Sequence, residues 1–167
     1  MKISARVILC SLVLLVVFQG AALAMGPFIR PVIGEEAPTF HLQSTTGSTV
    51  SISTYTKRQP IILFFWTTWC PHCRTQIRSL KTDYAELKKS GIALFTIDSG
   101  ESEGVVAKYV DREQISFPVL LDKDNKVSRA YRVVGVPTYV LIDGQGIIVH
   151  TANAFPNNYK FLLGLEE

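Results

Sequence analysis

The feature that most constrains this chain is a strand-like run that ends in a Cys-x-x-Cys motif. Residues 61–66 read Ile-Ile-Leu-Phe-Phe-Trp, a continuous apolar run rich in β-formers, which is typical of a strand buried on both faces. Cys70-Pro71-His72-Cys73 follows after three residues. Pro71 suits the first turn of a helix, where its missing N–H costs nothing and its fixed φ is already helical. The sequence therefore predicts a buried strand that delivers two thiols to a helix N-terminus.

The position of the two cysteines favours redox chemistry. At a helix N-terminus the unpaired N–H groups and the positive end of the dipole stabilise a thiolate. Cys70 and Cys73 lie three residues apart on one helical face, close enough to bond to each other. Cys70, at the helix start, is the candidate attacking thiolate, and Cys73, one turn further in, is the candidate resolving thiol. We interpret the pair as a reversible dithiol/disulfide site.

Other uses of the pair are weaker. A structural zinc site needs four ligands, but the chain has three cysteines, and Cys10 lies in the N-terminal apolar segment. The remaining ligands would have to come from the scattered His41, His72 or His150. A structural disulfide would close a very short loop, which stabilises least in the chain-entropy description. A copper carrier that uses both cysteines of the motif and a histidine as soft ligands stays an alternative. We expect no cofactor and no structural metal.

The first 24 residues have a pattern that predicts export from the cytoplasm. Lys2 and Arg6 give a basic start, residues 7–18 form an apolar core, and residues 22–24 (Ala-Leu-Ala) form a small-x-small exit. This is the pattern of a secretory signal peptide, which we predict for residues 1–24. The apolar core is short for a membrane span. An uncleaved anchor, which would tether the protein to the membrane through its N-terminus, is the alternative.

The rest of the chain is long enough for one domain with a sizeable core. Residues 25–35 are predicted as an extended lead-in, and residues 36–167 as the domain. The chain has 17 Lys and Arg against 14 Asp and Glu, and removal of Lys2 and Arg6 leaves 15 against 14. No run of like charge and no basic stripe occurs, which argues against nucleic acid as a partner. Export also makes a lasting disulfide chemically compatible with the compartment.

Strand and helix patterns alternate along this domain. The expected order is a hairpin at 39–52, the strand at 61–66, a helix from Pro71 to just before Gly91, a strand at 92–97, a helix at 103–113, an extended piece at 117–121, a short helix at 128–131, strands at 138–142 and 147–150, and a closing helix at 157–164. The two strands that flank the first helix should pair in parallel through the crossover. The late hairpin adds antiparallel strands. The predicted fold class is therefore α/β, with a mixed central sheet flanked by helices.

Two motifs in combination resemble the thioredoxin superfamily. They are residues 69–73 (Trp-Cys-Pro-His-Cys) after a buried strand and residues 135–138 (Gly-Val-Pro-Thr) before another. The resemblance implies a thioredoxin-like sandwich in which Pro137 is cis and lies against the disulfide. Val136 would then offer its backbone groups to an extended substrate strand. The residues that the resemblance implies for substrate contact are Trp69, Pro71, His72, Val136 and Pro137.

Within the superfamily the chain is similar to the TlpA/ResA-like group over residues 33–163. The segments that fit are the N-terminal hairpin, residues 64–70, a central insertion at 99–117 and residues 136–143. Members are periplasmic or membrane-anchored thiol–disulfide oxidoreductases, and several reduce the thiols of apocytochrome c before haem attachment. The resemblance therefore implies a periplasmic reductant that acts on protein thiols and disulfides and receives electrons from a membrane donor.

A carboxylate is expected near the thiols. Cytosolic thioredoxins place a buried aspartate six residues before the first cysteine, and Phe64 occupies that position here. The insertion of ResA-like proteins carries a glutamate near the active site, and Glu101 matches it. Because Cys73 must lose its proton to resolve a mixed disulfide, we predict Glu101 as the catalytic base, at the sheet edge where open α/β sheets put their sites. The acids interpreted as solvated strand-end or helix-face residues are Asp98, Glu103, Asp111 and Glu113.

The direction of electron flow stays open at this point. The dipeptide Pro71-His72 is that of the strong periplasmic oxidant DsbA, and a positive charge on His72 would stabilise the Cys70 thiolate and raise the potential. A DsbA-like thiol oxidant is therefore the alternative function. Thr67-x-x-Cys70 also matches the Thr-x-x-Cys of peroxiredoxins, although their upstream proline is missing here.

Overall fold

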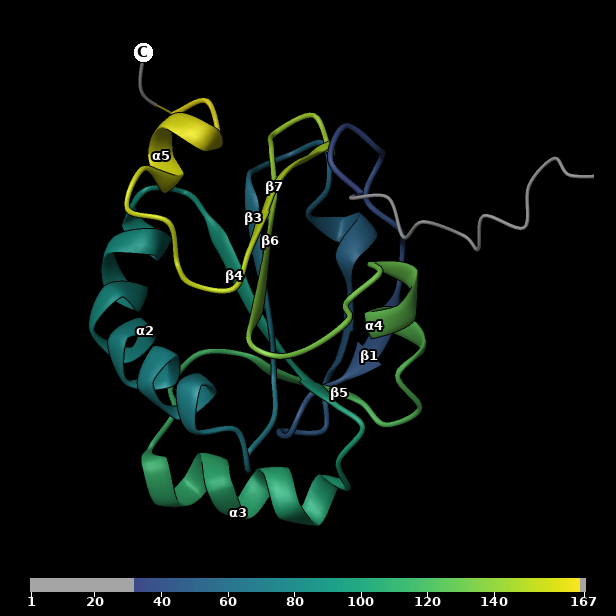
Figure 1. Ribbon diagram of the computed structural model, residues 1–167, viewed down its shortest axis with the longest axis vertical. Helices are drawn as coiled ribbons and strands as arrows, with labels where there is room; N and C mark the ends of the chain where they lie inside the picture. Colours follow the sequence, from purple (N-terminus) through teal and green to yellow (C-terminus); the bar gives the residue numbers. More distant parts are fainter. Residues whose placement is uncertain (1–31, 166–167) are drawn as a thin grey trace, which may run out of the picture. The chain divides into compact units, whose positions relative to one another are not determined.

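The computed structural model describes residues 32–165, and its elements follow the predicted order (Figure 1). The strands are β1 (His41–Gln43), β2 (Thr49–Ser51), β3 (Ile61–Trp66), β4 (Ala93–Ser99), β5 (Val119–Asp122), β6 (Thr138–Ile142) and β7 (Ile148–Ala152); the helices are η1 (Ile52–Thr54), α2 (Pro71–Lys89), α3 (Glu103–Glu113), α4 (Lys126–Ala130) and α5 (Tyr159–Leu162). The predicted signal peptide lies outside the described residues. Within the described part of the chain, no helix is long and apolar enough to cross a membrane.

The central sheet has the predicted mixed topology. Its strand order is β5-β4-β3-β6-β7. Strands β3, β4 and β5 are parallel, whereas β6 and β7 run antiparallel to their neighbours. Strands β1 and β2 form a separate antiparallel pair, which confirms the N-terminal hairpin. Every residue of β3 is fully buried, because this strand has a neighbour on each edge and a packed layer on each face.

The two faces of β3 pack against different layers. Ile62, Phe64 and Trp66 join a core cluster with residues of α2, α3 and the end of α5. The alternate residues of β3 join a second cluster with η1 and with Val127 and Tyr131 at α4. Figure 1 shows the sheet between α2 and α5 on one side and α4 and β1 on the other. The alternation of side chains along a strand therefore gives one continuous apolar run two separate cores.

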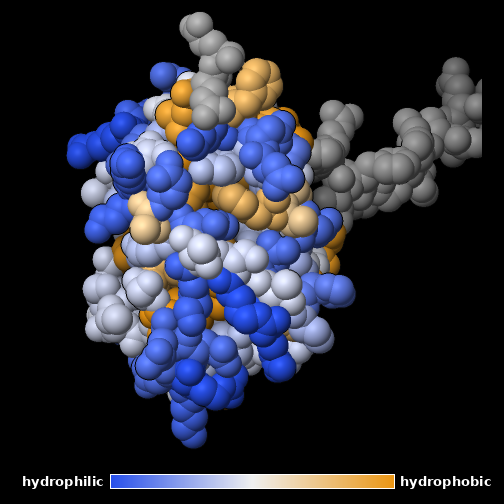
Figure 2. All heavy atoms as spheres, turned by 90° about the vertical axis from the view of Figure 1, so that its left-hand side faces the viewer, coloured by the Kyte–Doolittle hydropathy of each residue, from blue (hydrophilic) through white to orange (hydrophobic). Residues whose placement is uncertain are grey.

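Helix α2 owes its stability to one buried stripe. Its buried residues Ile77, Leu80 and Leu87 recur at helical spacing and join the core cluster beneath the sheet, as expected for an amphipathic helix. Hydrophilic side chains predominate on the face of the molecule that Figure 2 shows, where this helix lies. That face of α2 is therefore solvated.

Several element boundaries differ from the prediction by up to two residues, and those of β4, α4 and α5 are examples. Strand β4 continues to Ser99 because it pairs with β5 up to Asp122. Helix α4 begins at Lys126, two residues before the predicted start. Helix α5 is shorter than the predicted 157–164, and Gly164, with φ of 70°, ends it in the left-handed conformation that favours glycine.

The chain before the hairpin runs beside β7. Gly34 N–H donates to the carbonyl of Ile148 at 2.7 Å, and Ile148 N–H donates to the carbonyl of Glu35 at 2.9 Å. Val32 is buried in the second core cluster. These contacts cover part of the edge of β7, which would otherwise present unpaired backbone groups. The domain boundaries at residues 25–35 and 36–167 stay predictions.

Candidate active site

The Cys-x-x-Cys pair begins α2, as the sequence predicted. Cys70 is the N-cap of this helix, and its sulfur accepts the N–H of Cys73 at 3.2 Å. Pro71 follows at the first helical position, and the first turn holds no acidic residue. Cys70 and Cys73 form a disulfide, with 5.2 Å between their Cα atoms. In the reduced protein the same N–H and the positive helix end would stabilise a thiolate on Cys70.

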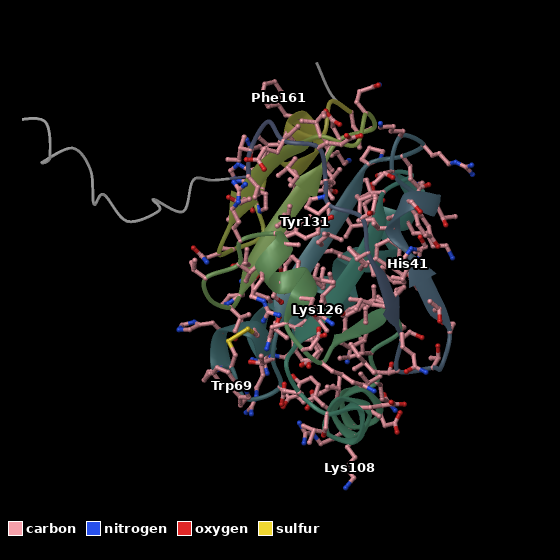
Figure 3. All side chains as sticks on the ribbon, turned by 90° about the vertical axis from the view of Figure 1, so that its right-hand side faces the viewer. His41, Trp69, Lys108, Lys126, Tyr131 and Phe161 are labelled. Atoms are coloured by element: carbon pink, nitrogen blue, oxygen red, sulfur yellow. A yellow bond between two sulfur atoms is a disulfide. The ribbon has the colours of Figure 1, made fainter. Side chains whose placement is uncertain are left out.

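The two sulfurs differ in access to solvent. Cys70 is 4% exposed, whereas Cys73 is fully buried among the residues of the first core cluster. Trp69, which precedes the pair, is 65% exposed. Figure 3 shows the disulfide beside Trp69 at the edge of the molecule. Cys70 is therefore slightly the more exposed of the pair, and the unequal roles of the two thiols stay a prediction.

The second motif meets the first at the sulfur. The Val136–Pro137 bond is cis, as the resemblance implied, and the carbonyl oxygen of Val136 lies 3.8 Å from Cys70 Sγ. Two hydrogen bonds fix this loop: Thr138 Oγ1 donates to the carbonyl of Gly135 at 2.7 Å, and Asn153 Nδ2 donates to the carbonyl of Pro137 at 2.9 Å. The structure thus brings together two motifs that are more than sixty residues apart in the chain.

The predicted substrate-contact residues divide by exposure. Trp69, Pro71 and His72 are exposed beside the reactive cysteine, Val136 is half-buried, and Pro137 is buried. The exposed three can meet a partner directly. The roles of all five as substrate contacts stay predictions.

Phe64, at the position where cytosolic thioredoxins have a buried aspartate, lies in an apolar environment. Phe64 is fully buried and stacks on Tyr139, with 4.5 Å between the ring centroids and 22° between the planes. The hydroxyl of Tyr139 donates to Gln76 Oε1 of α2 at 3.0 Å. This stack connects β3, β6 and α2 through packing, and it offers the thiols no carboxylate.

Glu101 is bound to the segment that precedes the pair. Its carboxylate accepts the N–H of Thr68 at 2.5 Å and the hydroxyl of Thr68 at 2.7 Å. From the other side, Arg74 Nε donates to the carbonyl of Thr68 at 2.8 Å. Within residues 32–165, Glu101 forms no hydrogen bond to either sulfur. Its role as the base stays a prediction, and the structure gives it a partner, Thr68, that the sequence did not suggest.

The interpretation of Asp98 as a solvated strand-end residue is wrong. It is fully buried, and it lies opposite Trp66 across the β3–β4 ladder. Its Oδ1 accepts the N–H of Glu101 at 3.1 Å, whereas its Oδ2 is buried and has no hydrogen-bond partner in the described part of the chain. Burial, followed by the interaction with the carboxyl group of Glu101, raises the pKa of Asp98 to about 8. The predicted strand at 92–97 stops just before Asp98. A prediction that the strand continues to Ser99 would have placed this carboxyl group in the buried sheet.

A second buried carboxyl group belongs to Asp122, at the end of β5. It accepts the N–H of Val127 at 3.1 Å, and both the N–H and the hydroxyl of Ser128 at 2.7 Å. These donors come from the first turn of α4, so Asp122 caps that helix. In the described residues, no group of three or more His, Cys, Asp or Glu side chains could hold a metal ion.

Comparison with known proteins gives one family and several relatives. The profile of the AhpC/TSA family matches residues 33–151. The thiol-disulfide oxidoreductase ResA of Bacillus subtilis is 34% identical over 116 residues, which make up 70% of this chain and 64% of ResA. The chain therefore matches less than two thirds of the length of that relative.

Solved structures agree with the fold. A Bacteroides thetaiotaomicron protein, provisionally described as a protein disulfide isomerase, superposes with a TM-score of 0.70 and 27% identity, over 79% of this chain and 86% of its own. A Chlorobium tepidum protein, provisionally described as the thiol:disulfide interchange protein DsbE, gives 0.69 and 28%, over 80% and 94%. These likenesses confirm the thioredoxin-like fold.

Proposed function

The chain belongs to the AhpC/TSA family, and from this premise we propose that it is a thiol–disulfide oxidoreductase that acts as a reductant, exchanging its Cys70–Cys73 dithiol with the disulfides of other proteins. The observation that carries the proposal is the disulfide at the N-terminus of α2, with the loop of Pro137 beside the more accessible sulfur. Helix N–H groups at Cys70 supply what a reactive thiolate needs.

Reduction of a substrate would take two steps. The thiolate of reduced Cys70 attacks one sulfur of a substrate disulfide; a mixed disulfide forms, and the released substrate thiolate takes up a proton. Cys73 then loses its proton and attacks the Cys70 sulfur, which re-forms the pair's disulfide and releases the second substrate thiol. Two electrons and two protons pass to the substrate. A donor must then reduce the pair again, and we assign that role to a membrane protein with a dithiol.

The substrate would approach along the face that holds Trp69 and Val136. Trp69 is exposed and offers a large apolar surface of the kind that anchors protein partners. An extended segment could pair with the backbone of Val136 by β-augmentation. The predicted export signal and the ResA relative support a periplasmic location, soluble or tethered through the N-terminus. Disulfides of apocytochrome c, which must be reduced to thiols before haem attachment, are the substrate class that this likeness favours.

The exchange reaction can be tested with insulin as the disulfide substrate. The reduced full-length protein should reduce insulin, whereas Cys70→Ser should be inactive. Cys73→Ser should accumulate mixed disulfides with partner proteins, because the resolving thiol is missing, and Cys70→Ser should not. The matched control is Ser79→Ala, an exposed change on α2 that leaves both cysteines in place and should leave both results unchanged. Equal trapping by Cys70→Ser and Cys73→Ser would contradict the assigned roles.

The direction of electron flow depends on the potential of the pair. Thioredoxin lies at about −270 mV and DsbA at about −120 mV. We expect the Cys70–Cys73 pair near the thioredoxin value, measured by equilibration with glutathione and dithiothreitol. A value near that of DsbA would favour the oxidant alternative, to which the exposed His72 next to the thiolate would then contribute.

Peroxide reduction is a second candidate, favoured by the family match and by the Thr67-x-x-Cys70 spacing. The Cys70 thiolate would attack the peroxide, break the O–O bond and become a sulfenic acid. Cys73 would then displace water and form the disulfide. Stopped-flow oxidation of the reduced pair by hydrogen peroxide tests this candidate: a rate no greater than that of glutathione would exclude it.

A further inference from the structure

Three buried polar atoms lack hydrogen-bond partners within residues 32–165, and all lie near the end of β3. They are Trp66 Nε1, Thr67 Oγ1 and Asp98 Oδ2. Trp66 and Asp98 are direct neighbours across the ladder, and Thr67 is the next residue toward the Cys pair. A buried carboxyl oxygen without a donor disfavours the ionised form of its group. The environment therefore favours a proton on Asp98.

The groups around Asp98 do not offset this preference. Those that interact with it electrostatically are the carboxyl groups of Glu101, from the following loop, and Asp122, from β5. On α2, Arg74 donates to the carbonyl of Thr68 instead. On α3, the ring packed against Trp66 is that of Tyr109, 5.3 Å away. Among the described residues, the donor that reaches the Asp98 carboxyl group is the N–H of Glu101.

Glu101 connects Asp98 to residues 67–70, the segment that ends in the reactive cysteine. Its carboxylate takes both donors of Thr68, at 2.5 and 2.7 Å, and charge-assisted hydrogen bonds of this kind are the stronger ones. Thr67, next in the chain, accepts the N–H of Cys70 through its carbonyl at 3.4 Å. The position of the Cys70 backbone thus depends on how Glu101 holds the preceding residues.

We infer that Asp98 is a positioning residue that holds the one proton of the Asp98–Glu101 pair, so that Glu101 stays ionised on Thr68 and fixes the segment before the reactive cysteine. The inference rests on the proposed thiol–disulfide exchange. When Asp98 loses its proton to solvent, two adjacent negative charges repel each other. Glu101 then leaves Thr68, and the extra negative charge also opposes the Cys70 thiolate.

The expected consequence is a bell-shaped pH profile. The exchange rate first rises with pH as the thiols ionise. It then falls above the pKa of Asp98, which burial and the Glu101 carboxylate raise to about 8. If exchange requires a proton on the Asp98–Glu101 pair, about a tenth of the protein is still in that form one pH unit above the pKa of Asp98.

The test compares Asp98→Asn with the wild type in exchange with oxidised glutathione between pH 6 and pH 9.5. Asparagine keeps the shape and stays neutral at every pH, so the falling limb should disappear, and near pH 9 the variant should be about tenfold faster than the wild type. Asp111→Asn, which changes an exposed acid of α3, is the control and should keep the wild-type profile. If the profiles of Asp98→Asn and the wild type overlay, the inference is wrong.

A measurement on the wild-type protein needs no variant. The amide of Thr68 should shift in an NMR titration with a midpoint near pH 8, because its hydrogen bond to Glu101 is lost as Asp98 ionises. A Thr68 amide that does not respond between pH 7 and pH 9 overturns the inference, even if Asp98→Asn fails to fold. Absence of exchange at every pH together with this shift would instead refute the proposed function and leave the proton linkage standing.

Discussion

Two carboxyl groups at the ends of neighbouring parallel strands, Asp98 on β4 and Asp122 on β5, have the same burial and different partners. Both side chains are fully buried. Asp122 accepts three hydrogen bonds from α4, whereas Asp98 accepts one, and its second oxygen has no partner in residues 32–165. Burial alone therefore does not decide what a carboxyl group does; the number of donors around it does. The satisfied group caps a helix, and the unsatisfied one lies next to the redox site.

The turns that follow the two strands explain the difference. After Asp122, Asn125 adopts a left-handed conformation with φ of 57°, and the chain turns back so that the first N–H groups of α4 reach the carboxyl group. After Asp98, Gly100 adopts φ of 88°, and only the N–H of Glu101 points back. The left-handed conformation favours glycine at position 100, and a Cβ there would also lie 2.7 Å from the end of the Asn125 side chain, which would have to move.

The largest expected effect is on stability, at Asp122. Asp122→Ala leaves three buried donors without an acceptor, and each such loss costs about 1–3 kcal/mol. We expect the free energy of unfolding to fall by about 3–5 kcal/mol in urea denaturation at pH 7. Asp124→Ala, in the same turn but exposed, should change it little. A loss at Asp122 of less than about 1 kcal/mol would remove the contrast between the two carboxyl groups.

Asp98 should affect how stability depends on pH. Its pKa is raised in the folded protein to about 8 from 3.8, so the folded state binds the extra proton between these values, and stability falls as pH rises through that window. The slope for one proton is about 1.4 kcal/mol per pH unit. Asp98→Asn removes this slope, so between pH 5 and pH 7 the variant should gain about 3 kcal/mol relative to the wild type in urea denaturation. Parallel curves would show that Asp98 is ionised in this range.

A smaller effect is expected at Ser128. Its hydroxyl donates to Asp122 and lies 2.9 Å from the hydroxyl of Ser99. Ser128→Ala removes one of three donors and leaves two N–H groups in place, so the free energy of unfolding should fall by about 1–1.5 kcal/mol. Ser79→Ala on the exposed face of α2 is the control. A loss as large as that of Asp122→Ala would mean that one hydroxyl, and not the set of donors, satisfies the carboxyl group.

The smallest effect is expected at Thr68. Thr68→Val removes the hydroxyl that donates to Glu101 and keeps the N–H that does the same. The free energy of unfolding should fall by only about 0.5–1 kcal/mol, but the thiol-exchange rate should respond, because the segment before Cys70 is held less firmly. Thr75→Val, on the exposed face of α2, should change neither quantity. An unchanged exchange rate in Thr68→Val would mean that the hydrogen bond from the Thr68 hydroxyl to Glu101 does not affect the reactivity of Cys70.

The local patterns of the sequence predicted most of the fold. The apolar run of β3, the proline that starts α2 and the helix expected at 103–113 each depend on residues close in the chain, and the observed elements agree with them. The Cys pair was evident for the same reason. The cis bond at Pro137 followed from the resemblance to thioredoxins and from no local pattern.

The burial of Asp98 could not be predicted from local patterns, because it depends on contacts between distant segments. Strand β4 continues to Ser99 only because β5 pairs with it there, and α3 packs against Trp66 through Tyr109 on the same face. The bond between Glu101 and Thr68 joins residues 33 positions apart. Such contacts depend on the path of the turn that follows each strand, which hydrophobic periodicity alone does not encode.

The most direct test of this account is the carbon-13 NMR titration of the aspartate side-chain carboxyl groups, with the Asp98 resonance assigned by its absence in Asp98→Asn. We expect the Asp98 carboxyl carbon to titrate with a midpoint near pH 8, the value to which burial and the neighbouring Glu101 carboxylate raise its pKa. A midpoint below about pH 5, within the ordinary range of aspartate, would mean that Asp98 carries no proton at neutral pH and would contradict the account.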